Sequence, residues 1–294
     1  MIGVLGATGR IGGEVATLLA ERGEQARALV RRPEADLPLP AVRADLAEPT
    51  TLPPALEGIS RLLLVTSHGP DQEAREAAAI DAATTAGVTR IVKVSGGAPS
   101  LGPNGATSTA VAHWRSEQRI EAAGVEFSFL RPSFYMQNLL DTVAPGIRKT
   151  GVLAAPLGDA PIAMVDARDV AACAVAALLD DEPAAHAWQI TGPRPASLAA
   201  VAAHCGARHV KVPLKAIART LRRRGADDFE LDHAVRMAAY FAAGSDGSTT
   251  DHVVRLTGRQ PRSIEAFLDE HRSSFSPETG LARALHRNPT KESR

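Results

Sequence analysis

IGVLGATGRIGG, residues 2–13, decides the fold of this chain. An apolar strand, Ile2–Leu5, runs directly into a turn in which Gly6, Gly9 and Gly12 recur at every third position, and a helical pattern follows. Gly6 permits a tight turn, Gly9 lets the backbone approach a phosphate, and Gly12 lets the helix pack closely on the strand. The N–H groups and the positive dipole end at the start of that helix then face an anion. The segment therefore predicts a site for the pyrophosphate of a dinucleotide.

The spacing of these glycines is G-x-x-G-x-x-G, which differs from the G-x-G-x-x-G of conventional dehydrogenases. A glycine pattern alone is weak evidence, and the alternative is a purely structural turn. Here the pattern lies between a predicted strand and a predicted helix, as a dinucleotide site requires. We therefore favour cofactor binding, and we expect the following residues of the loop to take part: Gly6, Thr8, Gly9, Arg10, Ile11 and Gly12.

The composition excludes several classes of protein. The 294 residues carry 33 Lys and Arg against 33 Asp and Glu, so no strong field is available to attract nucleic acid or an anionic membrane. Two cysteines, Cys173 and Cys205, allow no disulfide framework, and the histidines show no metal-ligand spacing. The longest apolar stretch, Val170 to Leu179, is too short to span a bilayer, and no signal peptide precedes the first strand. We expect a cytoplasmic protein without metal; abundant Ala and Arg with little Lys is typical of GC-rich bacteria.

Strand and helix patterns alternate through the first two thirds of the chain. The predicted strands are residues 2–5, 26–30, 41–43, 61–65, 90–94 and 126–130, and the predicted helices between them are residues 11–21, 71–86 and 109–123. Continuous apolar strands indicate burial on both faces. The repeated βαβ pattern therefore predicts an α/β fold of the Rossmann type, a doubly wound parallel sheet with right-handed crossovers.

The pattern loosens after Pro132, where proline and glycine become frequent. We expect an excursion above the sheet at residues 133–161. The chain is expected to return from this excursion with residues 162–165. Further strands are predicted at residues 188–191 and 209–212, and further helices at residues 168–179, 198–204, 214–223, 229–242 and 264–271. The domain prediction is a dinucleotide-binding core of residues 1–132 completed by 162–192, a mainly helical substrate lobe of residues 133–161 and 193–275, and a disordered tail of residues 276–294.

Ligands of an open parallel sheet bind beyond the carboxyl ends of its strands. Small, polar or charged residues stand at every one of these predicted strand ends. Outside the glycine turn, the residues that we assign to the cofactor site on this ground are Arg31, Arg32, Asp45, Leu46, Thr66, Ser67, Ser95, Gly96 and Pro132.

The end of the second strand distinguishes between the two nicotinamide dinucleotides. An NAD site usually places Asp or Glu there to accept from the ribose 2′-OH. This chain has Arg31 and Arg32, which would bind the 2′-phosphate of NADP through charge-assisted hydrogen bonds, with Arg10 in support. Asp45 would accept from the adenine amino group and Leu46 would pack on the ring. We therefore predict NADP; the alternatives are an exposed basic loop and an ordinary aspartate at a strand end.

The residues for catalysis are less distinct. A conventional short-chain dehydrogenase needs Tyr and Lys four residues apart on one helical face, because the Lys lowers the pKa of the Tyr that protonates an alkoxide. Neither Tyr135 nor Tyr240 is followed by such a Lys. The helix that should carry the pair has His113 and Glu117 on one face instead. We predict His113 as a proton donor and Glu117 as the carboxylate that favours its charged form, with a structural pair as the alternative.

An apolar pocket above the cofactor is expected to hold the substrate. The residues predicted to line it are His68, Trp114, Phe134, Tyr135, Met136 and Asn138. Plain core packing explains the aromatic side chains and Met136 equally well, and His68 also suits a surface loop.

Taken together, these residues resemble the NmrA-like branch of the atypical short-chain dehydrogenase/reductase superfamily. The segments that carry the resemblance are GATGRIG (6–12), ALVR (28–31), ADL (44–46), HWRSE (113–117), LRPSFYMQN (130–138), VDARDVA (165–171) and ITGP (190–193). The resemblance implies a Rossmann domain that prefers NADP(H) and a small C-terminal substrate lobe. Its members include quinone and azo-type reductases, reductases of aromatic natural-product pathways, and redox-sensing regulators. Some members carry Lys where this chain has Glu117, so a Lys-assisted proton relay from that position is not expected here.

We expect an NADPH-dependent reductase of a small conjugated carbonyl, quinone-like or an aromatic ketone, by hydride transfer from nicotinamide C4. Conjugation spreads the developing negative charge, so less help is required from a proton donor, which suits a site without the Tyr–Lys pair. Two alternatives stay open. One is a regulatory protein that senses the redox state of NADP with little catalysis, and the other is a tailoring enzyme that acts on aromatic polyketide-like substrates.

Overall fold

The chain divides into two compact units. The computed structural model describes residues 1–33, 36–157, 159–182 and 185–276. Unit 1 comprises Met1–Pro132, Ala167–Ile190 and His252–Arg259, and unit 2 comprises Ser133–Asp166, Thr191–Asp251 and the described residues from Gln260 onward. Relative to the predicted domains, residues 162–166 belong to unit 2 and residues 252–259 return to unit 1.

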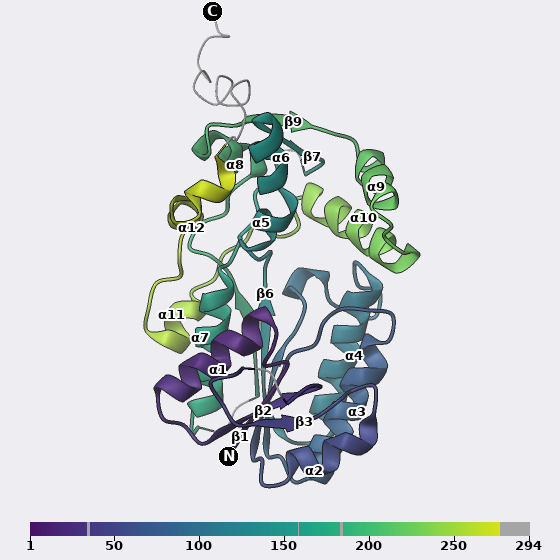
Figure 1. Cartoon of the computed structure of the whole chain (residues 1–294), viewed down its shortest axis with the longest axis vertical. Coiled ribbons are helices and arrows are strands. Elements are labelled where there is room, and N and C mark those ends of the chain that lie inside the picture. Colours follow the sequence, from purple (N-terminus) through teal and green to yellow (C-terminus); the bar gives the residue numbers. More distant parts are fainter. Residues whose placement is uncertain (34–35, 158, 183–184, 277–294) are drawn as a thin grey trace, which may run out of the picture. The chain divides into compact units, whose positions relative to one another are not determined.

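Unit 1 is built on a seven-stranded parallel sheet with the order β3-β2-β1-β4-β5-β6-β8 (Figure 1). Its strands are β1 (Ile2–Leu5), β2 (Ala26–Val30), β3 (Ala41–Arg43), β4 (Arg61–Leu64), β5 (Arg90–Val94), β6 (Glu126–Pro132) and β8 (Ala185–Ile190). The chain runs outward from β1 through β2 and β3, then returns to β4 and runs outward on the other side. The predicted Rossmann-type α/β fold is confirmed, and the strand order reverses between β1 and β4, where such sheets bind ligands.

Helices cover both faces of this sheet. On one face α1 (Arg10–Glu21) and α11 (His252–Thr257) pack against α7 (Ala167–Leu179), and on the other α3 (Gln72–Thr85) packs between α2 (Leu52–Leu56) and α4 (Ser108–Ala122) (Figure 1). The side chains of Leu62, Leu63 and Leu64 in β4 are all fully buried, because both faces of the strand are covered. Helix α11 was not predicted, since its six residues are too few to show a helical period.

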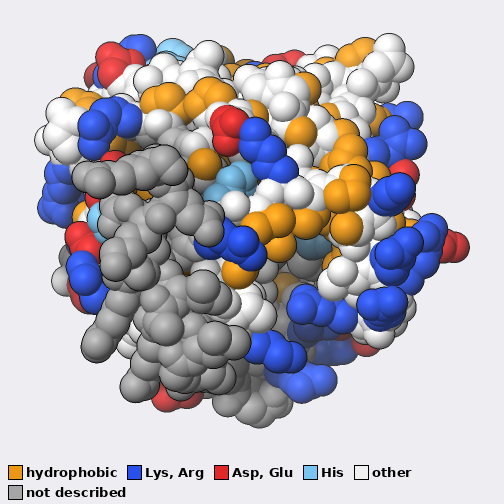
Figure 2. Space-filling view, turned by 90° about the horizontal axis from the view of Figure 1, so that it is seen from above, with side chains coloured by type: hydrophobic (Ala, Val, Ile, Leu, Met, Phe, Trp, Pro, Cys, Tyr) orange, Lys and Arg blue, Asp and Glu red, His pale blue; other side chains and the backbone are white. Residues whose placement is uncertain are grey.

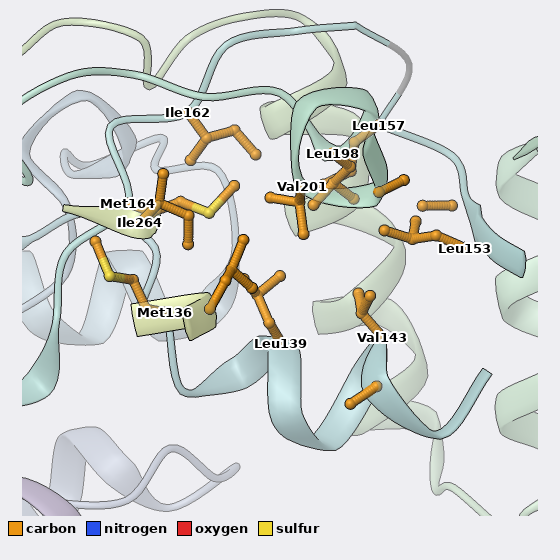
Figure 3. Close-up of a cluster of buried hydrophobic side chains, with 14 of the residues drawn as sticks. Met136, Leu139, Val143, Leu153, Leu157, Ile162, Met164, Leu198, Val201 and Ile264 are labelled. Carbon is orange, nitrogen blue, oxygen red and sulfur yellow. The ribbon is translucent and has the colours of Figure 1, made fainter. Parts of the chain in front are cut away.

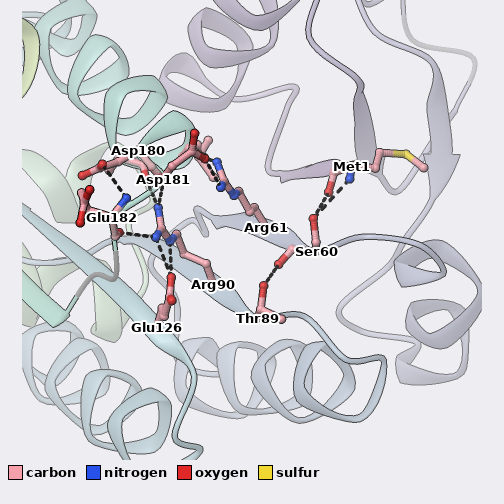
Figure 4. Close-up of polar contacts among 11 residues, drawn as sticks. Met1, Ser60, Arg61, Thr89, Arg90, Glu126, Asp180, Asp181 and Glu182 are labelled. Atoms are coloured by element: carbon pink, nitrogen blue, oxygen red, sulfur yellow. Dashed lines mark hydrogen bonds and ion pairs between the residues drawn. The ribbon is translucent and has the colours of Figure 1, made fainter.

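Two arginines close the carboxyl end of α7. Arg90, the first residue of β5, is buried and donates to the carbonyl of Ala177 in the last turn of α7 at 3.4 Å. It also donates to the carboxylate of Glu126 and, at 2.6 Å, to the carbonyl of Glu182 just beyond the helix (Figure 4). Arg61, the first residue of β4, donates to the carbonyl of Leu178 at 2.7 Å. Carbonyl groups at a helix end lack partners within the helix and attract cations, so the two guanidinium groups fix α7 to the amino-terminal edge of the sheet.

Unit 2 is mainly helical, with one small sheet. Its elements are α5 (Asn138–Thr142), α6 (Ala144–Thr150), β7 (Val152–Ala155), α8 (Leu198–His204), β9 (Arg208–Lys211), α9 (Leu214–Arg223), α10 (Asp228–Ala242) and α12 (Ile264–Glu270), with β7 and β9 paired in parallel. A core of buried apolar side chains, among them Met136, Leu139 and Ile162, holds these elements together (Figure 3). The predicted helices at 198–204 and 214–223 and the predicted strand near 209–212 are confirmed.

Residues 162–165, with which the chain was expected to return from the excursion, form no strand. Ile162 exchanges two backbone hydrogen bonds with Ala196, whereas Val165 donates to the carbonyl of Phe134. Because neighbouring residues bond to different segments, no ladder forms, although all four side chains are buried. The predicted excursion at 133–161 contains α5, α6 and β7. The predicted tail lies, apart from Ser276, outside the described residues.

Among the described helices, none combines the length and the apolar character needed to cross a membrane.

On the face seen in Figure 2, Lys and Arg side chains lie beside a band of hydrophobic ones. The basic residues of α9 and its end are exposed: Lys215, Arg219, Arg222, Arg223 and Arg224.

Candidate functional site

The glycine turn after β1 has no room for a side chain at Gly6 or at Gly12. Gly6 has a φ of +85°, and a Cβ on it would lie 2.4 Å from the carbonyl oxygen of Val65. A Cβ on Gly12 would lie 2.2 Å from the oxygen of Gly6. Both distances are far below contact, so only glycine fits at these two positions. The Gly9 N–H donates to that same Gly6 oxygen at 2.9 Å and closes the turn.

The turn leads into an uncapped helix start. Gly9 is the N-cap of α1, no side chain caps it, and the first turn carries no acidic residue. Thr8, Gly9 and Arg10 are exposed, whereas Ile11 and Gly12 are buried and pack the helix on the sheet. The first N–H groups of this twelve-residue helix therefore lack a side-chain acceptor and favour an anion. The cradle fits the pyrophosphate of a dinucleotide.

The other predicted cofactor residues lie at the same edge of the sheet of unit 1. They follow the strands β2 to β5, apart from Pro132, which ends β6: Arg31, Arg32, Asp45, Leu46, Thr66, Ser67, Ser95 and Gly96. Arg31 and Arg32 are exposed. Ser95 is buried, and its Oγ has no partner within the described residues, so a bound molecule could satisfy it.

Two of these residues already have structural partners. The Asp45 carboxylate accepts from the N–H of Ala47 at 3.0 Å and closes its own turn, as an aspartate at a strand end often does. The hydroxyl of Thr66 donates to Glu76 at 2.5 Å, so it faces a buried polar cluster. The contact between Asp45 and adenine stays a prediction.

That cluster joins β5, α3 and α4, and the sequence did not reveal it. Lys93 of β5 donates from Nζ to Glu76 Oε2 of α3 at 2.8 Å, and both side chains are 0% exposed. The same Nζ lies 3.1 Å from Nδ1 of His113 in α4. Gln72 of α3 lies beside both, with its Nε2 at 3.3 Å from Glu76 Oε1 and 3.1 Å from His113 Nε2. The signal in the sequence was Lys93, which stands between the apolar residues Val92 and Val94 in a central strand.

Charge keeps the buried carboxyl of Glu76 ionised. Burial by itself raises the pKa of Glu76, but electrostatic interactions with Lys93 and His113, with hydrogen bonds from Lys93 and Ser116, outweigh it and lower this pKa from 4.5 to about 2. Glu76 is therefore ionised at neutral pH.

His113 lies at the carboxyl end of β5. Its side chain is 12% exposed, and a Cβ on Gly96 would lie 3.3 Å from its Cδ2. The ring therefore lies against the backbone of a predicted cofactor residue, at the edge of the sheet where ligands bind. The structure thus brings the predicted proton donor close to Gly96 within unit 1.

Glu117 has a different partner from the one that helical spacing predicted. Its carboxylate, 1% exposed, accepts two hydrogen bonds from Arg131 of β6, at 3.0 and 2.5 Å. The carboxylate paired with the His113 cluster is Glu76 of α3, not the residue one turn away on α4. The predicted effect of Glu117 on His113 is replaced by that of Glu76, and a catalytic role of Glu117 stays a prediction.

The predicted pocket residues fall in both units. In unit 1, His68 is exposed after β4 and Trp114 is half-buried on α4. In unit 2, Met136 is 1% exposed and belongs to the apolar core, which agrees with the alternative of plain core packing. The remaining three, Phe134, Tyr135 and Asn138, are half-buried, and Phe134 packs edge-on against Phe241 at 5.3 Å between ring centroids.

The described part of the chain has neither a cluster of metal ligands nor a thiol with a lowered pKa. Within residues 1–33, 36–157, 159–182 and 185–276, no three His, Cys, Asp or Glu side chains gather as metal ligands would. Burial raises the pKa of Cys173 to about 12 and that of Cys205 to about 11, so both stay protonated and unreactive at neutral pH.

A doubly wound parallel sheet, a side-chain-free glycine turn and an uncapped helix start define a Rossmann-type dinucleotide-binding protein. The chain belongs to the NmrA-like family, which matches residues 1–197, and the predicted resemblance is confirmed.

The chain is similar to two reductases over nearly its whole length. It is 35% identical to the NAD(P)H azoreductase of Xenophilus azovorans, over 94% of this chain and 99% of that protein. It is 34% identical to the (4-alkanoyl-5-oxo-2,5-dihydrofuran-3-yl)methyl phosphate reductase of Streptomyces griseus subsp. griseus, over 95% of this chain and 100% of that protein.

Two solved structures share the fold. The NADPH-dependent quinone oxidoreductase of Escherichia coli, complexed with NADPH, has a TM-score of 0.83 at 24% identity, over 92% of this chain and 99% of that one. The Citrobacter sp. triphenylmethane reductase complexed with NADP(H) has a TM-score of 0.80 at 22% identity, over 92% and 99%.

Proposed function

We propose that this protein is an NADPH-dependent reductase of small conjugated acceptors, with a quinone-like compound or an aromatic ketone as its substrate. The observation that carries the proposal is the glycine turn, where Gly6 and Gly12 leave no space for any side chain beside an uncapped helix start. Two relatives named above are a NAD(P)H azoreductase and a quinone oxidoreductase. Azo groups and quinones both spread the charge left by an added hydride, which supports a conjugated substrate here.

We assign the selection of NADPH over NADH to arginines near the glycine turn. Arg31 and Arg32 follow β2, where the ribose 2′-position of a Rossmann-bound nucleotide lies, and both are exposed and cationic. Arg10 begins α1 and lies next to the glycine turn in sequence. Guanidinium groups form strong paired hydrogen bonds with a phosphate, so these three side chains would favour NADPH over NADH.

The chain itself supplies binding, orientation and a proton. NADPH, when bound, supplies a hydride from C4 of its nicotinamide. The tight turn at Gly6 and the close packing at Gly12 bring the uncapped start of α1 to the pyrophosphate. The buried hydroxyl of Ser95, at the end of β5, is available to a polar group of the bound cofactor. His113, beside Gly96, holds the proton that completes reduction of a carbonyl oxygen. Conjugation in the substrate reduces the strength of acid that this step requires.

Steady-state oxidation of NADPH with a panel of quinones and aromatic ketones tests the proposal, and calorimetry with NADPH and NADH tests the cofactor. We expect turnover above background with at least one quinone and tighter binding of NADPH than of NADH. Tight binding of NADPH without turnover on any acceptor would overturn the reductase and favour a protein that senses the redox state of NADP.

A further inference from the structure

We propose that Lys93 and Glu76 are positioning residues that hold His113 with its proton on Nε2, and that Lys93 passes a proton to Nδ1 when His113 protonates the substrate. The reaction it serves is the proposed reduction, so the inference rests on that function. Lys93 and Glu76 themselves touch neither cofactor nor substrate, because both side chains are 0% exposed.

The first argument is that stability alone does not favour a buried ion pair over apolar side chains at these positions. Removing two charges from water costs several kcal/mol for each ion, and apolar residues of similar volume are often as good or better for stability. Lys93 lies in a strand whose five residues are all buried, where an apolar side chain would fit the sheet. The pair instead meets a third ionisable group, His113, at 3.1 Å from Lys93 Nζ.

The second argument is that Lys93 fixes the tautomer of His113. An ammonium group has three donors and no acceptor, so Nδ1 of His113 must accept from Lys93 Nζ. A neutral imidazole has one N–H, which is then on Nε2. Glu76 Oε2 accepts another hydrogen bond from Lys93 Nζ at 2.8 Å.

Gln72 completes this assignment. Its Oε1 is buried without a partner, while its Nε2 lies 3.1 Å from His113 Nε2. The same Gln72 atom lies 3.2 Å from Nδ1, so the amide lies against both ring nitrogens. A half-turn of the amide lets its oxygen accept the N–H on Nε2 of His113 and moves its NH2 group to the position where the oxygen had no partner. This rotation of the amide removes the 3.3 Å contact between Gln72 Nε2 and Glu76 Oε1. Glu76 Oε1 keeps the hydrogen bond from Thr66.

The third argument is access to solvent. His113 is 12% exposed, whereas Lys93 and Glu76 are both 0% exposed, so of these three groups only His113 can exchange protons directly with its surroundings. When hydride adds to a carbonyl carbon, the bond between Nε2 and its proton breaks and an O–H bond forms on the substrate. One N–H bond of Lys93 breaks and an N–H bond forms at Nδ1. The neutral Lys93 amine, still beside Glu76, regains its proton through the same ring from water after the product leaves.

One experiment reads the tautomer directly, without cofactor or substrate. Nitrogen NMR of the ¹⁵N-histidine-labelled full chain, with His113 assigned by His113→Gln, should show Nδ1 unprotonated and Nε2 protonated at neutral pH. The double variant Lys93→Met/Glu76→Leu replaces the pair by apolar side chains, and its His113 should populate both tautomers. A proton on Nδ1 in the unmodified chain would overturn the proposal, even if the double variant failed to fold.

A second experiment separates proton delivery from hydride transfer. Reduction of a quinone needs a hydride and a proton, whereas a cationic triarylmethane dye needs the hydride alone. In the double variant we expect the ratio of kcat for the quinone to kcat for the dye to fall about tenfold or more. An unchanged ratio would overturn the relay. The matched control is Arg119→Met, which removes an exposed ion pair between the same helices, Arg119 with Asp81, and should leave the ratio unchanged.

The two experiments distinguish a failure of this inference from a failure of the proposed function. A chain that reduces neither acceptor would refute the proposed function, while the NMR result would still decide how His113 is held.

Discussion

Removal of the buried Lys93 charge gives the sharpest prediction for stability. In Lys93→Met the carboxylate of Glu76, 0% exposed, loses its cation and keeps only neutral hydrogen-bond donors and His113. Breaking one side of a buried ion pair costs about 3–5 kcal/mol, because the remaining charge stays out of water. We therefore expect the free energy of unfolding to fall by about that amount at pH 7.

The lowered pKa of Glu76 gives an independent value of similar size. A carboxyl whose folded pKa is depressed contributes stability above its ordinary pKa and loses it as pH falls through the folded value. For Glu76 that window runs from 4.5 down to about 2, and at about 1.4 kcal/mol for each pH unit it corresponds to about 3 kcal/mol. In Lys93→Met burial raises this pKa without the opposing ammonium, so the deficit should shrink as pH falls and Glu76 becomes protonated.

Urea unfolding of the unmodified chain and of Lys93→Met, at pH 7 and at pH values down to about 4, measures both effects. Lys93→Met/Glu76→Leu is the partner variant, and it should recover at least half of the loss because no unpaired charge remains. Arg119→Met, which removes an exposed pair, should change stability by less than about 1 kcal/mol. A loss below about 1 kcal/mol in Lys93→Met at pH 7, or no recovery in the double variant, would refute this reasoning.

Three further predictions concern the cofactor and unit 2. Gly12→Ala places a Cβ 2.2 Å from the Gly6 oxygen, so calorimetry should show NADPH binding weakened about tenfold or more; unchanged affinity would contradict the cradle. Arg31→Ala/Arg32→Ala should weaken NADPH binding by about 10- to 100-fold and leave NADH binding nearly unchanged, and an equal loss for both would argue against phosphate selection. Burial raises the pKa of Asp246, so its contribution to stability is present below the ordinary pKa and lost as pH rises through the raised one. Asp246→Asn should remove that decline in unfolding experiments between about pH 4 and 8, and an unchanged pH dependence would count against it.

The sequence predicted the parts of the fold that depend on neighbouring residues. The strands at 2–5, 26–30, 41–43 and 90–94 were predicted with the bounds that the structure has. For the strands inside the sheet the reason is that continuous apolar runs mark burial on both faces, whereas the edge strand 41–43 is only partly buried. The glycine turn was also predictable, since spacing within one short segment encodes it. Helix α11 and strand β7 are short and show too little periodicity to be predicted.

The sequence did not predict which side chains from distant parts of the chain contact one another. Helical spacing placed Glu117 one turn from His113, yet Arg131 of β6 takes its carboxylate. Glu76, which faces His113 instead, comes from a different helix, and Lys93 comes from a strand that was interpreted as plain apolar core.

By itself, then, the sequence determined the Rossmann-type sheet of unit 1, the glycine turn and the membership of the NmrA-like family, because each is encoded in residues close together along the chain. Only the tertiary structure decided which buried charges meet. Lys93, Glu76 and His113 lie on β5, α3 and α4, and no periodicity within one element relates them. They are brought together because α3 and α4 pack side by side over the sheet, and once out of water each charge requires the others as partners.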